Sequence, residues 1–228
     1  MGLFGDAWQY IQDNPDRFRE ALSVHVRLSL YALIAAIVIF VPLGILASRG
    51  KWLSQSVVGV ISSLRVIPSL AVIFLLYPYR RDLGDLLPMF DRSFSLALIA
   101  LTLLAGPPLI INTDAAMRGI DQSVIESARG LGMNRLQVFF RVQLPLALPV
   151  IIAGVRTASV EIIASATLAA FIGVGGLGRF ITSGLTLYDF SLLLVGAIPV
   201  TLLTLFAEGS LAAIERWLKP PTTSRAPG

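Results

Sequence analysis

Four ionisable side chains within apolar stretches could carry chemistry in this sequence: Arg65, Arg156, Glu161 and Glu208. Charge at membrane depth is costly and by default marks a functional site. Glu161 could attract a cationic solute, or it could pair with Arg65 or Arg156, and the sequence leaves both alternatives open. Arg156 and Glu161 are five residues apart, so they do not face each other well on one helix.

Glu161 also belongs to a row of residues at four-residue intervals that is polar or small throughout. The row comprises Thr157, Glu161, Ser165, Ala169 and Gly173. Such a face suits helix packing or a cavity and not lipid. Arg156 and Glu208, near the expected ends of their helices, could instead extend their charged groups to the interface.

A metal centre has little material here, because the chain has no cysteine and one histidine, His25. We expect no metal site, and we interpret His25 as an interfacial residue.

Gly173-x-Gly175-x-x-Gly178 formally matches a dinucleotide fingerprint, but it follows an apolar helix and not a strand. We interpret these glycines, with Gly176, as a tight and flexible helix end near a pathway mouth. The alternative is a plain helix-to-loop turn.

The elements that position these residues are expected to be membrane helices. Of 228 residues, 55% are hydrophobic and 14% are charged, whereas an average soluble domain has about 25% charge. Five apolar stretches each approach the roughly 20 residues that a bilayer requires. They are residues 26–47, 55–77, 94–112, 146–172 and 190–214. The expected fold class is an all-α polytopic membrane protein, since lipid-exposed backbone must satisfy its own hydrogen bonds.

The chain divides into three expected parts. Residues 1–23 read as an amphipathic surface helix, for which a solvated lead-in is the alternative, and they do not resemble a cleavable signal peptide. Residues 24–216 form the transmembrane domain, and residues 217–228 form a flexible C-terminal tail.

The distribution of Lys and Arg predicts the orientation. One side holds nine of them: Arg49, Lys51, Arg118, Arg129, Arg135, Arg141, Arg216, Lys219 and Arg225. The other side holds six: Arg17, Arg19, Arg80, Arg81, Arg92 and Arg179, accompanied by eight acids. We therefore expect the first side in the cytoplasm, with the N-terminus outside and the C-terminus inside.

The long connection at residues 113–145 falls on the expected cytoplasmic side. Ser123 and Glu126 fit a capping box that would start a helix, and Gly130 and Gly132 would end it. A second start at Asn134 and Gln137 precedes a stop at Pro145. The spacing predicts Val124, Ile125, Ala128 and Leu131 on one apolar face. Such a helix pair could lie on lipid headgroups or dock into a partner protein.

The same loop resembles the EAA loop of ATP-binding-cassette (ABC) importer permeases. The resemblance rests on Glu126-Ser127-Ala128, Gly132 and Val142-Gln143-Leu144-Pro145, at the spacing of that motif. It implies the type I ABC importer permease fold with a cytoplasmic coupling helix. It further implies that the coupling residues are Glu126, Ser127, Ala128, Gly130, Gly132, Leu144 and Pro145.

Three other segments are similar to permeases for glycine betaine, carnitine and choline. They are Arg65–Ala71, Gly154–Ala158 and Ala166–Gly178. A methionine-like or other small solute is the alternative substrate. The pathway candidates are Arg65, Pro68, Ser69, Thr157, Glu161, Ser165, Thr167, Gly173, Gly175, Gly176 and Gly178.

The resemblance also implies the partners and the location. A pair of ABC ATPases would bind ATP and Mg²⁺, so this chain would need no cofactor. An external substrate-binding protein and a second permease, identical or paralogous, would complete a transporter in the bacterial inner membrane.

Two other classes of function are the alternatives. An intramembrane enzyme would need a catalytic constellation, which the sequence does not offer, and a passive channel would not depend on ATP. Nothing in the sequence suggests a nucleic-acid partner.

Overall fold

The computed structural model describes residues 2–64 and 66–218, with the backbone alone at residues 51, 53, 57 and 64. This part of the chain is helical and contains no strand. The helices are α1 (Leu3–Asp13), α2 (Pro15–Ala47), α3 (Lys51–Leu64), α4 (Ser69–Leu76), α5 (Arg80–Asp85), α6 (Arg92–Leu104), α7 (Gly106–Arg118), α8 (Gln122–Gly130), α9 (Arg135–Val138), α10 (Leu144–Ala166), α11 (Gly178–Leu187) and α12 (Phe190–Leu218). The all-helical expectation is therefore confirmed.

Four helical stretches of the described residues are long and apolar enough to cross a membrane. They are Pro15–Ala47, Arg92–Arg118, Arg135–Ile172 and Phe190–Leu218. Each contains one of the predicted spans. The apolar stretch expected at 55–77 is divided into two helices, α3 and α4, on either side of Pro68, one of the prolines that interrupt the expected spans.

The break between α3 and α4 has a local cause. Pro68 precedes α4 with extended backbone (φ −57°, ψ 135°). A proline lacks the backbone N–H and disfavours helical geometry at the residue before it, here Ile67. Hydropathy alone does not register this effect, whereas the proline in the sequence does. Arg65 lies outside the described residues.

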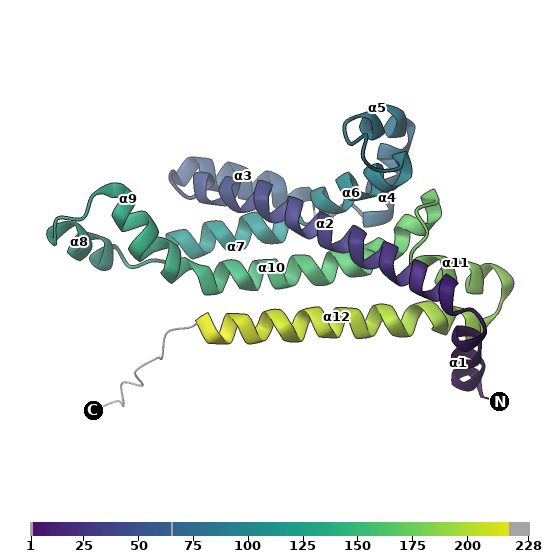
Figure 1. Ribbon diagram of the computed structural model, residues 1–228. Coiled ribbons are helices and arrows are strands. Elements are labelled where there is room, and N and C mark those ends of the chain that lie inside the picture. Colours follow the sequence, from purple (N-terminus) through teal and green to yellow (C-terminus); the bar gives the residue numbers. More distant parts are fainter. Residues whose placement is uncertain (1, 65, 219–228) are drawn as a thin grey trace.

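Helix α10 is the centre of the bundle, in contact with α2, α7 and α12 (Figure 1). The main apolar core joins α2, α6 and α10 through small residues such as Ala36, Ala100 and Ala158, which are fully buried. Small side chains let helix backbones approach closely, as is usual in membrane bundles. Larger residues, among them Leu28 and Ile162, fill the remaining space.

The N-terminal segment is helical but not a single surface helix. Helix α1 covers residues 3–13, and residues 15–23 already belong to the long α2. Tyr10 of α1 and Phe18 of α2 both contact the ring of Phe180 in α11, at centroid distances of 5.9 and 6.5 Å. Helix α1 also packs against α12. This aromatic cluster therefore fixes the segment to the bundle.

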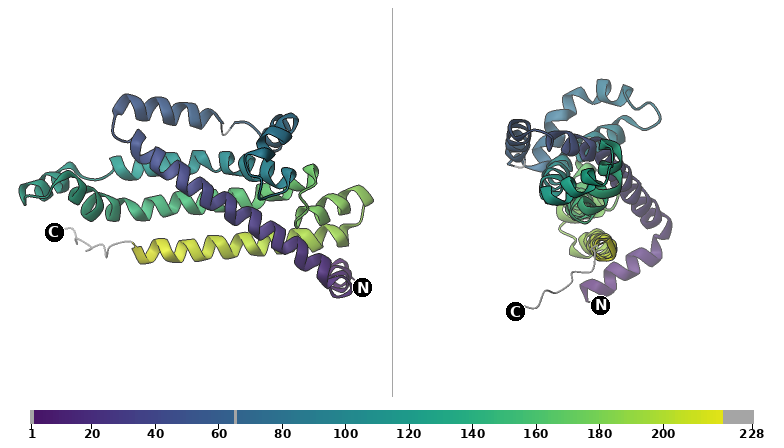
Figure 2. Two further views of the ribbon diagram at one scale, coloured as in Figure 1. Left: turned by 45° about the horizontal axis from the view of Figure 1, so that its top comes forward. Right: turned by 90° about the vertical axis from the view of Figure 1, so that its left-hand side faces the viewer.

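The two ends of the bundle carry different elements. Helices α8 and α9 lie at the end where α12 finishes, and α1 and α11 lie at the opposite end (Figures 1 and 2). Helix α12 continues to Leu218, and residues 219–228, which include Lys219, Arg225 and most of the expected tail, lie outside the described residues.

Candidate functional site

Helix α8, which holds Glu126, Ser127 and Ala128, begins two residues earlier than the predicted cap at Ser123 implies. Asp121 is its N-cap, and its carboxylate accepts a hydrogen bond from the Ser123 backbone N–H at 2.9 Å. This bond holds the pKa of Asp121 below its ordinary value. The predicted capping box at Ser123 and Glu126 is therefore wrong, because Asp121 occupies the cap position. Glu126 is exposed and accepts from Gln122 at 3.3 Å.

The connection to α9 follows the prediction. Helix α8 ends at Gly130, and Gly132 has a left-handed backbone (φ +82°) that favours glycine. Asn134 and Gln137 form a reciprocal capping box, with both hydrogen bonds at 2.9 Å. These caps fix where α9 begins and therefore the angle between the two helices.

A small apolar core holds α8 and α9 together. Ile125, Ala128 and Val138 are buried against one another. The expected apolar face is only half buried, because Val124 and Leu131 point outward, and Leu131 is 81% exposed. Exposed Leu136 and Phe140 extend this outer surface. The end of the bundle thus presents apolar side chains next to Glu126, Ser127 and Arg129. We call this outer surface the α8–α9 tip.

Pro145 does not end the helix that begins at Arg135. The helix continues from Arg135 to Ile172, with a π-helical turn at Phe139–Gln143 and Pro145 in the first turn of α10. A wider turn accommodates a proline that cannot donate to the preceding turn. Leu144 is half-buried against α7 and α10 residues. The α8–α9 tip is therefore rigidly joined to the central helix.

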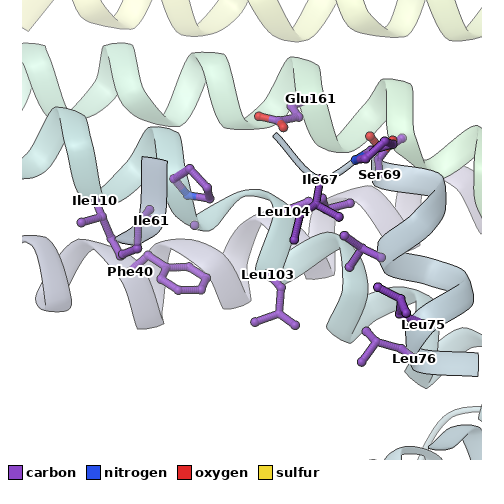
Figure 3. A pocket seen from close by; sticks show the side chains of 15 residues that line it. Phe40, Ile61, Ile67, Ser69, Leu75, Leu76, Leu103, Leu104, Ile110 and Glu161 are labelled. Carbon is purple, nitrogen blue, oxygen red and sulfur yellow. The ribbon is translucent and has the colours of Figure 1, made fainter. Parts of the chain in front are cut away.

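A cavity of about 440 Å³ lies between α2, α3, α4, α6, α7 and α10. Most of its lining is apolar, and the polar side chains come from Ser69, Glu161 and Ser165 (Figure 3). Pro68 also lines it. The structure thus brings four predicted pathway residues, from α10 and from the start of α4, to one place.

Two other members of the predicted pathway set lie elsewhere. Thr157 is exposed, and its hydroxyl donates to the Ala153 carbonyl at 3.1 Å. Thr167 donates to the Ala164 carbonyl at 2.7 Å, just beyond α10. Neither lines the cavity. Because Thr157 belongs to the row at four-residue intervals, only part of that row, Glu161 and Ser165, faces the cavity.

The glycine-rich segment forms a tight turn between α10 and α11. Gly173, Gly175 and Gly176 have φ values of +86°, +84° and +73°. Gly178 packs so closely that a Cβ there would collide with the Thr167 carbonyl. The segment is therefore fixed by backbone geometry.

His25 lies beside this turn and is not interfacial. It is 1% exposed, and its Nε2 lies 3.1 Å from the Ile163 carbonyl of α10. Its ring also borders Gly176. His25 therefore packs α2 against α10 and the glycine segment.

Arg156 binds two carboxylates of α12. Its Nε lies 3.3 Å from Glu208 Oε1, and its Nη1 lies 3.1 Å from Glu215 Oε2. Arg156 is therefore held by α12, a pairing that the sequence interpretation did not name. Sequence reasoning missed Glu215, although its position seven residues after Glu208 places it on the same helix face.

The sequence did not predict a second polar contact between helices, which joins α3 to α7 and is buried. The Ser54 hydroxyl of α3 donates to Asp114 Oδ2 of α7 at 2.8 Å, and both residues are buried. The sequence carried a signal for this contact, because Asp114 lies only two residues after the third predicted span, and an acid so close to membrane depth calls for a partner.

Comparisons with known proteins agree with this architecture. Residues 40–220 match the family of binding-protein-dependent transport system inner membrane components. The chain is 41% identical to the carnitine transport permease protein OpuCB of Listeria monocytogenes, with 95% of each chain covered. It is 35% identical to the choline transport system permease protein OpuBB of Bacillus subtilis, again over 95% of each. It is 34% identical to the osmoprotectant import permease protein OsmW of Salmonella typhimurium, over 94% and 98%.

The fold resembles that of solved transporters. An inward-facing structure of the MetNI methionine ABC transporter superimposes with a TM-score of 0.78, at 18% identity, over 89% of this chain and 96% of that one. At this identity the likeness concerns the fold, and it confirms the expected type I permease architecture.

Proposed function

Because the chain belongs to the family of binding-protein-dependent transport system inner membrane components, we propose that it imports quaternary-amine osmoprotectants such as glycine betaine, carnitine and choline. The observation that carries this proposal is the near full-length similarity to permeases named for carnitine, choline and osmoprotectants. The chain is the multi-pass membrane subunit of an ABC importer and not an enzyme.

The α8–α9 tip is the proposed docking surface for the ATPase subunit. Its exposed Leu131 and Leu136 offer apolar contacts, and Glu126 and Arg129 offer polar ones. Helix-in-groove recognition uses this combination of an apolar anchor and a polar rim. The ATPase would bind ATP and Mg²⁺, and movement of its groove would displace α8, α9 and the helix that continues into α10.

The cavity beside Glu161 is the proposed part of the solute pathway in this subunit. Its volume falls within the range of about 300–1,000 Å³ that is usual for small-molecule sites. Ser69, Ser165 and Glu161 supply polar groups in an apolar wall, which suits a solute with a charged headgroup and methyl substituents. A second permease, identical or paralogous, would close the other side.

The proposed orientation places the α8–α9 tip in the cytoplasm and the α1 and α11 end outside. Arginines flank the loop at the tip end, at Arg118, Arg129, Arg135 and Arg141, as the positive-inside rule requires. The opposite end would receive solute from an external binding protein.

Uptake into proteoliposomes tests this function. The permease would be reconstituted with its ATPase and binding protein, and labelled glycine betaine, carnitine, choline and methionine would be compared with and without ATP. We expect ATP-dependent uptake of at least one quaternary amine and none of methionine. Uptake of methionine alone would overturn the substrate assignment, and uptake without ATP would overturn the importer.

A further inference from the structure

The ion pairs of Arg156 form a specific junction between two helices. The guanidinium uses two different nitrogens, Nε for Glu208 and Nη1 for Glu215. A planar guanidinium holds such a geometry more firmly than a lysine could. Glu208 and Glu215 are two helical turns apart on one face of α12, so Arg156 is held between them. We call these three residues the Arg156 junction.

The junction is partly withdrawn from solvent. The side chain of Glu215 is 10% exposed, and those of Arg156 and Glu208 are 32% and 43% exposed. Leu211 of α12, which lies between the two acids in sequence, packs against the main apolar core. The ion pairs therefore lie at a packed helix interface and not on a freely moving surface.

The two helices that meet here are connected differently to the α8–α9 tip. Helix α10 is the direct continuation of α9, through Phe139–Gln143. Helix α12 follows α10 in the chain only after the glycine segment and α11, at the far end of the bundle (Figure 1). A displacement of the tip therefore reaches α10 through the backbone, but it reaches the C-terminal half of α12 through side-chain contacts.

From this arrangement we infer that the Arg156 junction makes α12 follow α10 during transport, so that Arg156, Glu208 and Glu215 are positioning residues of the coupling mechanism. This inference rests on the proposed ATP-driven function. A contribution to folding stability does not account well for the junction. A partly buried ion pair adds little net free energy to folding, because the loss of hydration offsets the attraction between the charges. A fixed pairing geometry is more useful for keeping two moving helices in register.

A variant without any of the three charges separates coupling from folding. The triple variant Arg156→Gln, Glu208→Gln, Glu215→Gln removes the ion pairs and leaves no carboxylate unpaired, so the bundle should still assemble. Arg156→Lys keeps the charge but loses the two-pronged geometry. The control is Arg92→Gln, which breaks the exposed Arg92–Asp85 pair (3.5 Å) at a loop far from the tip.

The readout is the number of solute molecules moved per ATP hydrolysed by the complete transporter. For the triple variant we expect a fall of about tenfold in this ratio, with ATP hydrolysis changed less than about twofold. Arg156→Lys should lie between the triple variant and the native chain, and Arg92→Gln should match the native chain. An unchanged ratio, or an equal fall for Arg92→Gln, would overturn the inference, as would a parallel loss of transport and hydrolysis.

A second measurement does not depend on which solute is carried. The chain has no cysteine, so Trp217→Cys introduces a single exposed thiol near the end of α12. A fluorophore there should change its emission when ATP binds to the native complex, and the triple variant should lose this change. An unaltered response in the triple variant would show that α12 follows α10 without the junction. If no quaternary amine is transported, the proposed substrate is wrong, and this fluorescence assay still decides the role of the junction.

Discussion

Single residues determine where helix α8 begins at one end of the bundle. At the other end, a single residue determines how closely α11 approaches the end of α10. Asp121 sets the first turn of α8 by accepting a backbone hydrogen bond. Gly178 allows α11 to approach the Thr167 carbonyl. Neither residue lines the cavity beside Glu161, yet each determines the position of an element that transport would use.

Replacing Asp121 with alanine should loosen the start of α8. The Ser123 N–H loses its acceptor, and we expect its hydrogen exchange to be roughly fivefold faster. Ser127→Ala is the control, because that hydroxyl only bonds back to the Ser123 carbonyl. Equal exchange rates in the two variants would contradict the capping role.

The same cap predicts a pH dependence. The pKa of Asp121 is lowered in the folded chain, so its contribution is complete above the ordinary carboxyl pKa and is lost as the pH falls through the lowered value. Exchange at Ser123 measured from pH 6 downward, corrected for intrinsic rates, should therefore accelerate only in the acid range. The Asp121→Ala variant should not show this acceleration.

Replacing Gly178 with alanine should destabilise the bundle. The new Cβ meets backbone atoms of Thr167 that cannot move independently of α10, and we expect a loss of about 3 kcal/mol in unfolding free energy. Gly209→Ala in α12 is the matched control, since no atom lies within 4 Å of a Cβ there. Thermal unfolding in detergent should show a lower midpoint for Gly178→Ala alone. Equal midpoints would mean that the turn can shift at little cost.

Among the elements, helices α8 and α9 combine a small internal core with the outward apolar surface of the α8–α9 tip. Ile125, Ala128 and Val138 hold the two helices together, and the outward side chains remain for a partner. With the proposed docking on the ATPase, this division would leave the internal core of the two helices intact.

Replacing Leu131 with serine should weaken binding of the ATPase without unfolding the permease. The side chain is 81% exposed in the isolated subunit, and loss of one apolar anchor typically weakens an interface by about tenfold. Leu187→Ser is the control, because Leu187 is 68% exposed at the opposite end of the bundle. Titration of the ATPase onto immobilised permease gives the two affinities. An equal affinity for both variants would place the ATPase elsewhere.

For the whole molecule, the orientation is testable because the α8–α9 tip and the α1 and α11 end lie at opposite ends of the bundle. The chain has no cysteine, so single thiols can be placed at each end. A membrane-impermeant maleimide applied to intact spheroplasts should label Met89→Cys, between α5 and α6, and not Leu131→Cys, both of which are well exposed. The reverse pattern would invert the proposed orientation.

The sequence was sufficient for the overall architecture because lipid-facing helices must be apolar along their length. The EAA-like segment predicted the family, which the match over residues 40–220 confirms. The break before α4 follows from Pro68 and not from hydropathy, because hydropathy measures composition and not backbone geometry. Hydropathy placed Glu208 near the end of its helix but could not say that Arg156 faces it, since which helices are neighbours is a property of the fold.

The unbroken helix from Arg135 to Ile172 has a mechanical consequence. At 1.5 Å per residue its 38 residues span about 57 Å, so it can act as a lever. If the helix pivots where it crosses α2 and α7, a tilt of about 5° displaces its two ends by a combined distance of about 5 Å. A modest push at the tip therefore suffices to shift the glycine segment by about 2–3 Å when the pivot lies near the middle of the helix.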